Sequence, residues 1–272
     1  MTIEIFVTPN LRTSHIKAVN RLNELSYKTL FLNFSENLEL LVRDLVENRL
    51  TYKNFFEIIR QRKLVPEPIN GWKYTAEPIL KSLTKARLFN RELKCHCYRD
   101  EEYDLLSTDV AYEIALLTLR VIIKRKIDAE DWKKILKKGV DHRCDALDRE
   151  MDLVHKKASQ ECVCVSGLDG KELEQRLSAK GHNVILTDVE EFYHPTPIEI
   201  LKERLAKKDI SIEETEELVK EHMIYVRKYI LKSRNRDQAY YQWAYDRFPS
   251  IRQEIDSEEI KHLDIILPLD DV

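Results

Sequence analysis

Short apolar runs alternate with stretches of helical periodicity along most of the chain, and residues 161–186 show this most clearly. Residues 162–165 form a run of cysteine and valine, which is typical of a strand buried on both faces. Leu173 and Leu177 stand four residues apart, as on one face of a helix, and residues 184–186 resume an apolar run. The pattern predicts a right-handed βαβ unit.

The same alternation predicts further strands at residues 3–7, 29–32 and 93–98. Ser14 and Ser211 are expected to be N-caps of helices. Residues 65–72 are expected to form a loop, and residues 265–268 either an edge strand or a disordered end. Helices are predicted at residues 14–25, 38–62 (as two helices), 75–89, 104–158 (as three helices), 198–206 and 211–234, with more helix up to residue 248.

These elements predict an α/β protein with a mostly parallel sheet of about five strands, large helical insertions and a C-terminal helical extension. The sheet domain is expected to span residues 1–190, with helical insertions at about 37–90 and 101–158. The helical extension is expected to comprise residues 191–272.

Composition narrows the class of protein. The 272 residues carry a net charge of −3, which argues against nucleic acid binding over the whole surface and leaves room for a local basic patch. No apolar stretch approaches the ~18 residues of a membrane span, and the N-terminus lacks a signal-peptide pattern, so a cytoplasmic protein without a membrane partner is predicted. The low count of 5 glycines, beside abundant Lys, Glu and Ile, suits a heat-adapted source.

The cysteines are expected to pack in the core. The chain has 5 cysteines, an odd number, and most lie in predicted strands, so a disulfide framework is not expected. Cys95-His96-Cys97 resembles a zinc-binding sequence, but zinc ligands normally lie in turns with wider spacing, which favours core packing.

Polar residues follow the predicted strands. The carboxyl ends of parallel strands meet at one edge of a sheet, where ligands usually bind. Asp169, Glu36 and Asp100 are therefore candidate ligands for Mg²⁺ or Mn²⁺, which prefer oxygen donors. The alternative is that these acids cap helices and face water. The residues expected at this edge are Asn10, Arg12, Asn33, Glu36, Arg99, Asp100, Asp169 and Asp188.

The turn from Gly167 to Gly170 allows two interpretations. Its backbone amides, at the start of a helix, could receive an anion or a polar ligand. Alternatively, the glycines only make the turn tight and Asp169 caps the helix.

The sequence from Leu147-Asp148-Arg149-Glu150 through residues 162–170 to residues 177–181 resembles the superfamily of TraB proteins, haem-uptake ChaN proteins, erythromycin esterases and Tiki proteases. The resemblance covers roughly residues 3–186. It implies a metal-assisted hydrolase whose strand-end residues bind a metal or activate water. The family has a Gly-x-x-His after the first strand and a similar turn after the fourth, and here these places hold Thr8-Pro9-Asn10 and Gly167-Leu168-Asp169.

Both family histidines are thus replaced, so the resemblance predicts a divergent hydrolase with a degenerate active site. The positions that match the family pattern make Asp169, Glu36 and Asn10 its candidate catalytic residues. His194, in a loop after the last predicted strand, is either a general base or a structural residue.

Residues 225–247 form a basic and aromatic segment that predicts a partner surface. Cations bind phosphates and aromatic rings stack on bases, so a single-stranded nucleic acid is one candidate partner. A protein, including a second copy of this chain in a homodimer, is another. The alternative is that the aromatic side chains pack in the core while the cations stay in water. The candidate binding residues are Arg227, Lys232, Arg234, Arg236, Tyr241 and Trp243.

Overall fold

The computed structural model describes residues 2–66, 68–90, 92–261 and 263, so the predicted edge strand or disordered end at residues 265–268 lies outside it. The described residues form a five-stranded, all-parallel sheet with the order β3-β2-β4-β1-β5. This confirms the α/β class and the strand number. The strands are β1 (Thr2–Val7), β2 (Thr29–Ser35), β3 (Lys94–Arg99), β4 (Cys162–Ser166) and β5 (Asn183–Asp188).

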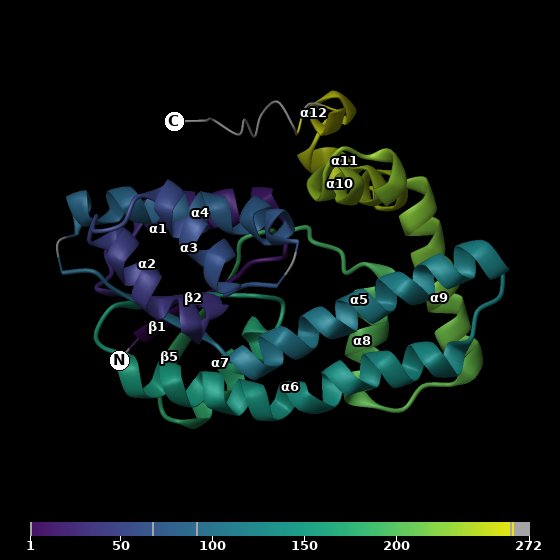
Figure 1. Ribbon diagram of the computed structural model, residues 1–272, viewed down its shortest axis with the longest axis horizontal. Helices are drawn as coiled ribbons and strands as arrows, with labels where there is room; N and C mark the ends of the chain where they lie inside the picture. The colour runs from purple at the N-terminus through teal and green to yellow at the C-terminus, as the bar shows by residue number, and fades with distance from the viewer. Residues whose placement is uncertain (1, 67, 91, 262, 264–272) are drawn as a thin grey trace. The chain divides into compact units, whose positions relative to one another are not determined.

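Helices connect the strands and continue after the last one (Figure 1). In the first part of the chain they are α1 (Arg12–Glu24), the 3-10 helix η1 (Glu36–Leu38), α2 (Glu39–Val46), α3 (Tyr52–Arg62), α4 (Ile69–Phe89), α5 (Glu101–Lys124), α6 (Ala129–Lys157) and α7 (Gly170–Ala179). After β5 they are α8 (Pro197–Lys207), α9 (Ile212–Lys228), the 3-10 helix η2 (Ile230–Lys232), α10 (Arg236–Arg247), α11 (Ile251–Glu254) and α12 (Ser257–Lys261).

The chain folds into two compact units. The first unit contains the described residues up to Thr108 together with His142–Glu191, and the second contains Asp109–Asp141 and the described residues from Phe192 onward. Residues 109–141, which the sequence grouped with the sheet domain, therefore pack in the second unit. The long helices α5 and α6 each contribute residues to both units.

The sheet of the first unit is covered on both faces. One face presents Phe6, Leu32 and Val165 to the helices α1 to α4. The other presents Ile5 and Cys164 to the C-terminal part of α6 and to α7. In Figure 1 the strands of this unit lie between these two helical layers. Burial on both faces explains why the strands are apolar runs and do not alternate between apolar and polar residues.

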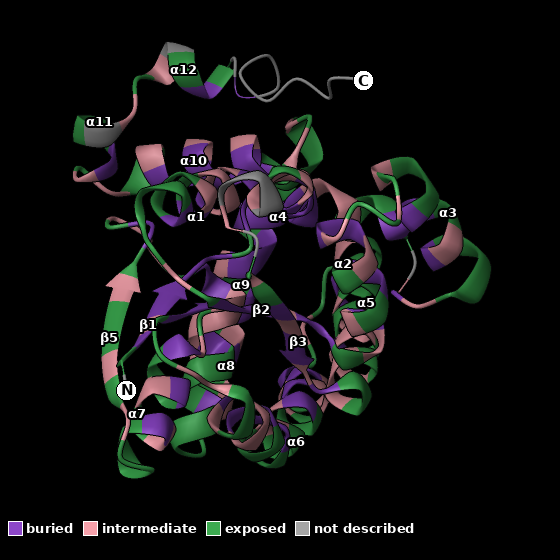
Figure 2. Cartoon of the chain, turned by 90° about the vertical axis from the view of Figure 1, so that its left-hand side faces the viewer, coloured by how far each residue is buried: buried purple, intermediate pink, exposed green. Residues whose placement is uncertain are grey.

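Strand β5 departs from this rule. The sequence predicts a buried strand at residues 184–186, but Ile185 and Leu186 are exposed. Strand β5 pairs with β1 alone at one edge of the sheet, but edge position does not by itself explain the exposure, because Cys95, Cys97 and Tyr98 of the opposite edge strand β3 are buried. Figure 2 shows β5 in the colours of exposed and intermediate residues, whereas most of β1 is buried.

Helix α1 begins earlier than predicted, and Ser14 is not its cap. Leu11 is the N-cap residue, and Ser14 lies inside the helix, where its Oγ donates to Glu190 Oε2 at 3.1 Å. A tertiary partner has therefore replaced the expected local hydrogen bond. At Ser211 the prediction is confirmed, since its side chain accepts a hydrogen bond from the Glu214 N–H at 3.1 Å.

Two other helices are longer than predicted. Helix α4 starts at Ile69, so residues 69–72 belong to a helix and Pro78 lies in its interior. Helix α6 is one helix of 29 residues where two were expected. Gly139 does not interrupt it, and a Cβ there would make an ordinary van der Waals contact with Val110, at 3.6 Å.

The second unit has an apolar core of its own. Leu117 of α5 and Trp132 and Leu136 of α6 pack with residues of α8 and α9, among them Leu201 and Val219. The helices in the described part of the chain include none that is long and apolar enough to cross a bilayer.

Candidate functional site

The topology defines a place for a ligand between β2 and β4. The connections that follow β1 and β2 pack on one face of the sheet, and those that follow β3 and β4 pack on the other. Strands β2 and β4 are neighbours, and the chain leaves β2 toward β3 on one side and β4 toward β5 on the other, so the two connections diverge from the point between these strands. Ligands of open α/β sheets usually bind at such a switch point.

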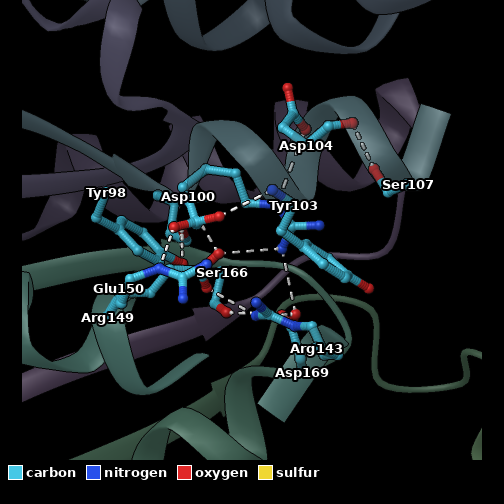
Figure 3. A network of polar contacts seen from close by, with 12 residues as sticks. Tyr98, Asp100, Tyr103, Asp104, Ser107, Arg143, Arg149, Glu150, Ser166 and Asp169 are labelled. Atoms are coloured by element: carbon cyan, nitrogen blue, oxygen red, sulfur yellow. Dashed lines mark hydrogen bonds and ion pairs between the residues drawn. The ribbon is translucent and has the colours of Figure 1, made fainter. Parts of the chain in front are cut away.

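Two arginines and two carboxylates meet at this edge. Arg143 Nη2 donates to Glu150 Oε2 at 2.7 Å and forms a second ion pair with Asp169. Arg99 Nη1 lies 3.4 Å from Asp169 Oδ2 and 3.7 Å from Glu150 Oε1. Figure 3 shows Arg143, Glu150 and Asp169 pointing toward one another. Each carboxylate thus faces both guanidinium groups.

Tyr103 completes this group, which we call the arginine cluster: Arg99, Tyr103, Arg143, Glu150 and Asp169. The guanidinium carbon of Arg99 lies 4.8 Å from the centre of the Tyr103 ring, and that of Arg143 lies 5.0 Å from it. Such cation–π contacts attract the planar cations to the ring. Tyr103 thus contacts both cations of the cluster.

The electrostatics of the cluster follow from burial and from the arginines. Burial disfavours the charged form of Asp169, but the charges of Arg143 and Arg99 outweigh it and hold the pKa of this carboxyl below its usual range. Asp104 behaves in the opposite way, since burial raises its pKa although Arg99 lies 3.9 Å away. Two carboxyls on neighbouring elements thus differ in protonation behaviour, which is common at functional sites.

Asp169 does not cap α7, as one of the two sequence interpretations expected. It stands at the N-cap position but makes no side-chain cap hydrogen bond: its Oδ2 faces the two arginines, and its Oδ1 accepts from Ser166 Oγ at 3.5 Å. The other interpretation is that backbone amides of this turn bind an anion. The Gly170 N–H is not available for this, because it donates to the Gly167 carbonyl at 3.1 Å. Gly170 is required for packing, because a Cβ there would lie 2.8 Å from Val7 Cγ2.

The predicted metal ligands do not form a metal site. Asp100 Oδ2 accepts from Arg149 Nε at 2.6 Å and Asp100 Oδ1 accepts from the Tyr103 N–H at 2.8 Å, so this acid caps α5. These two hydrogen bonds, together with the arginine charges, lower the pKa of Asp100. Residues 2–66, 68–90, 92–261 and 263 include no group of three His, Cys, Asp or Glu side chains placed to hold a metal ion. Arginines balance the acids, and this donor set does not fit Mg²⁺ or Mn²⁺.

Glu36 remains open to solvent at the end of β2. Partial burial raises its pKa, and the negative charges of Asp100, Glu39 and Glu150 add to the effect, while Lys157 opposes it. A carboxyl with a raised pKa that still reaches water is suited to accept a proton.

Asn33, near the end of β2, lies beside the turn after β4. A Cβ at Gly167 would lie 3.2 Å from Asn33 Nδ2 and 3.3 Å from Asp169 Oδ1, so the missing side chain at Gly167 leaves these two polar groups close together. Asn33 Oδ1 is buried and has no hydrogen-bond partner among the described residues. The same is true of Arg143 Nε and Nη1, and of Ser35 Oγ. Buried polar atoms in this state are unusual and call for a partner.

Two other predicted edge residues have different positions. Arg12 forms a buried salt bridge with Glu77 of α4 at 2.7 Å and donates to the Tyr74 carbonyl at 2.8 Å. These contacts fix α1 against α4, so Arg12 has a structural role. Asn10 is exposed in the loop between β1 and α1.

The remaining candidates belong to the second unit. His194 stacks on Phe248, with ring centres 3.8 Å apart, and its Nε2 lies 3.1 Å from Ser250 Oγ. Burial lowers the pKa of His194. Tyr240 binds its backbone N–H at 2.8 Å. These contacts support the structural interpretation of His194.

The aromatic residues of the basic segment are also structural. Tyr241 and Trp243 are buried, and Trp243 packs edge-on against Tyr225 with ring centres 5.3 Å apart. The expectation that these rings stack on bases is therefore wrong for this structure, because the rings form the core around α10. The predicted cations, Arg227, Lys232, Arg234 and Arg236, are all exposed.

Sequence reasoning missed Arg143, Tyr103 and Glu150 as site residues. A signal for two of them exists in the pattern of α6, where Arg143, Leu147, Glu150 and Val154 follow helical spacing on the face that meets the sheet. A charged residue on the apolar face of a helix becomes buried and needs a partner of opposite charge. Two such residues on one face therefore indicate a buried polar site.

No family model, curated protein or solved structure matches the chain. The resemblance to the TraB, ChaN, erythromycin esterase and Tiki superfamily thus stays a hypothesis, drawn from topology and from the motif at residues 147–150.

Proposed function

We propose that the first unit binds a small polar molecule at the carboxyl edge between β2 and β4 and hydrolyses it. The observation that supports binding is the set of buried polar atoms without partners: the donors Arg143 Nε and Nη1 and the acceptor Asn33 Oδ1. A ligand that carries both an acceptor, such as a carbonyl or phosphoryl oxygen, and a donor would satisfy them. The expected ligand is polar and not strongly anionic, because Asp169 and Glu150 already balance the arginines.

In the proposed reaction, Glu36 is the general base. Its carboxylate takes a proton from water while the water oxygen forms a bond to the carbonyl carbon or phosphorus of the substrate. The bond to the leaving group then breaks, and Glu36 returns the proton to that group. The arginine cluster supplies positive charge near the developing negative oxygen, which is the role that the family resemblance assigns to a metal.

A substrate screen tests this reaction. The probes are p-nitrophenyl esters and p-nitroanilides, and p-nitrophenyl phosphate, a dianion, is expected not to be turned over. Glu36→Gln is expected to lower kcat by about 10²–10⁴-fold on any probe that is turned over, because general base catalysis typically contributes this factor. Glu102→Gln is the matched control, since the Glu102 side chain is 91% exposed. Unchanged kcat in Glu36→Gln would rule out the assigned role.

Binding is tested separately through Asn33. Asn33→Ala removes a buried acceptor without a partner, so the free protein is expected to keep or raise its melting temperature. The same change removes an anchor for the ligand. Small polar compounds that raise the melting temperature of the wild type are expected to lose that effect on Asn33→Ala. A marked loss of stability in the free variant would show that Asn33 serves the fold instead.

A second candidate function is binding of the nucleic acid backbone by the second unit, and the exposure of its predicted cations favours it. Without exposed rings, this binding would rest on charge alone. Arg234→Glu with Arg236→Glu is expected to weaken binding of a fluorescent single-stranded DNA and to reduce the slope of log K against log salt by about 2. Arg60→Glu with Arg62→Glu, which changes exposed cations of α3, is the control. Equal effects of the two pairs would contradict a specific site.

A further inference from the structure

Helix α5 carries an apolar stripe that faces solvent. Tyr112, Leu116, Leu119 and Ile123 are between 44% and 79% exposed. Large apolar side chains at single exposed positions are ordinary, but an aligned row of them on one helix is not.

The stripe lies on the face of α5 opposite the core of the second unit. Val110 and Leu117 are buried, and Ile114 and Val121 lie with Leu117 on that inner face. At 100° per residue these inner positions cluster about half a turn away from the stripe. The core of the unit therefore leaves the stripe uncovered.

The spacing of the stripe matches a helix seam. Its members follow one another at intervals of four, three and four residues, which is the spacing of a and d positions in a heptad repeat. A strict a and d stripe is narrower than the apolar face of an ordinary surface helix and is typical of a pair of packed helices.

Charges along α5 indicate the identity and direction of the partner helix. Asp109 lies near the N-terminal end of the stripe, and Arg125 and Lys126 directly follow the helix at its other end. Glu113 and Arg120 of α5 are already paired within the chain, with Lys138 at 3.4 Å and Asp131 at 2.9 Å. A parallel copy of α5 would place like charges together. An antiparallel copy places acidic residues beside basic ones.

We propose that this chain forms a homodimer in which α5 packs antiparallel against α5 of a second copy. About a two-fold axis between Leu116 and Leu119, Leu116 faces the partner's Leu119 and Tyr112 faces the partner's Ile123. Asp109 then lies opposite the partner's Lys126. A two-fold interface repeats each contact, so every pair occurs twice.

Sedimentation velocity of the full chain tests this proposal. The wild type is expected to be a dimer at tens of micromolar. Leu116→Glu places a charge against the partner's Leu119 and is expected to raise the dissociation constant at least about tenfold. Leu231→Glu is the matched control, because Leu231 is 67% exposed on η2, and its dimer is expected to persist. Circular dichroism must show unchanged helix content in both variants.

Charge exchange gives a test of direction. In the single variant Asp109→Lys, the introduced lysine lies opposite the partner's Lys126, which has the same charge. In the single variant Lys126→Asp, the introduced aspartate lies opposite the partner's Asp109, again with the same charge. Each single change is expected to weaken the dimer, and the double change is expected to restore it. A wild type that stays monomeric up to about 100 µM, a concentration far above the dissociation constant of a stable interface, would overturn the proposal and leave the stripe to a different partner. A dimer unaffected by Leu116→Glu, or a double change weaker than both single ones, would overturn it as well.

Discussion

At the scale of one residue, Arg143 is a mostly buried charge that two carboxylates balance. Its guanidinium is mostly buried, yet it faces Glu150 at 2.7 Å and Asp169, and the Tyr103 ring lies beneath it. Burial and these charges act in opposite directions on the pKa of Arg143, and the charges raise it. An ion pair of this kind contributes little to stability compared with an apolar core, but losing one partner is costly.

Arg143→Ala is therefore expected to lower the free energy of unfolding by about 3–5 kcal/mol, because it leaves Glu150 and Asp169 with less positive charge nearby. Urea denaturation followed by circular dichroism measures this. Arg149→Ala is the comparison: Arg149 pairs with Asp100 but is 51% exposed. Its removal is expected to cost at most about 1 kcal/mol. If Arg143→Ala and Arg149→Ala lowered the free energy of unfolding equally, the arginine cluster would not behave as a buried set of charges.

The pH dependence of stability is also a property of single carboxyls. Asp169 and Asp100 have pKa values below their usual range, so each stabilises the fold when ionised. Their contributions are present above the unfolded pKa of about 3.9 and are lost as the pH falls through the folded values. Glu36, with a raised pKa, has the opposite sign and costs stability as it ionises.

We therefore expect the unfolding free energy of the wild type to fall as the pH drops below about 4. In Arg143→Ala this fall should be shallower, because the variant lacks a charge that depresses the pKa of Asp169. Urea denaturation at a series of pH values gives the two slopes. A steeper slope in the variant would show that other groups control acid unfolding.

At the scale of elements, the entry into α7 depends on one glycine. The helix begins so close to β1 that a Cβ at Gly170 would lie 2.8 Å from Val7 Cγ2. Gly170→Ala is expected to push α7 off the strand and to cost about 1–3 kcal/mol. Gly71→Ala is expected to have the opposite sign and to stabilise α4 by about 0.5–1 kcal/mol, since nothing lies within 4 Å of the new Cβ. Thermal unfolding of both variants checks the signs.

Much of the element order could be predicted from the sequence because burial leaves a clear pattern. Strands β1 to β4 are covered on both faces, and residues such as Ile5 and Cys164 report that environment directly. The errors concern interactions that are distant in sequence. Ser14 resembles a cap but binds Glu190, and residues 184–186 resemble a buried strand but form the edge of the sheet.

The candidate site was predicted in part for the same reason. That Glu36, Asn33, Arg99, Asp100 and Asp169 lie at or just after the ends of strands could be predicted from the pattern, and their shared edge follows from a parallel sheet. The distances between these side chains could not be predicted from the sequence. Arg143 enters from a helix that the sequence divides in two, and its presence turns a predicted metal site into an arginine cluster.

At the scale of the whole molecule, both units depend on segments that are distant in sequence. The core of the second unit needs Leu117, Trp132 and Leu136, which precede β4 in the chain. A fragment of residues 192–272 is therefore expected not to fold, and a peptide of residues 109–141 is expected to restore helix content when added. Cooperative thermal unfolding of the fragment alone, seen by circular dichroism, would contradict this.

The distribution of cysteines provides a way to time the opening of the sheet. Cys95, Cys97, Cys162 and Cys164 are buried in β3 and β4, whereas Cys144 is exposed on α6. Burial also raises the pKa of Cys95 to about 12, so this thiol is protonated as well as shielded. A maleimide should thus label Cys144 at once and the other thiols only when the strands separate. The slow phase of labelling, followed by mass spectrometry, would then measure the rate at which the first unit opens.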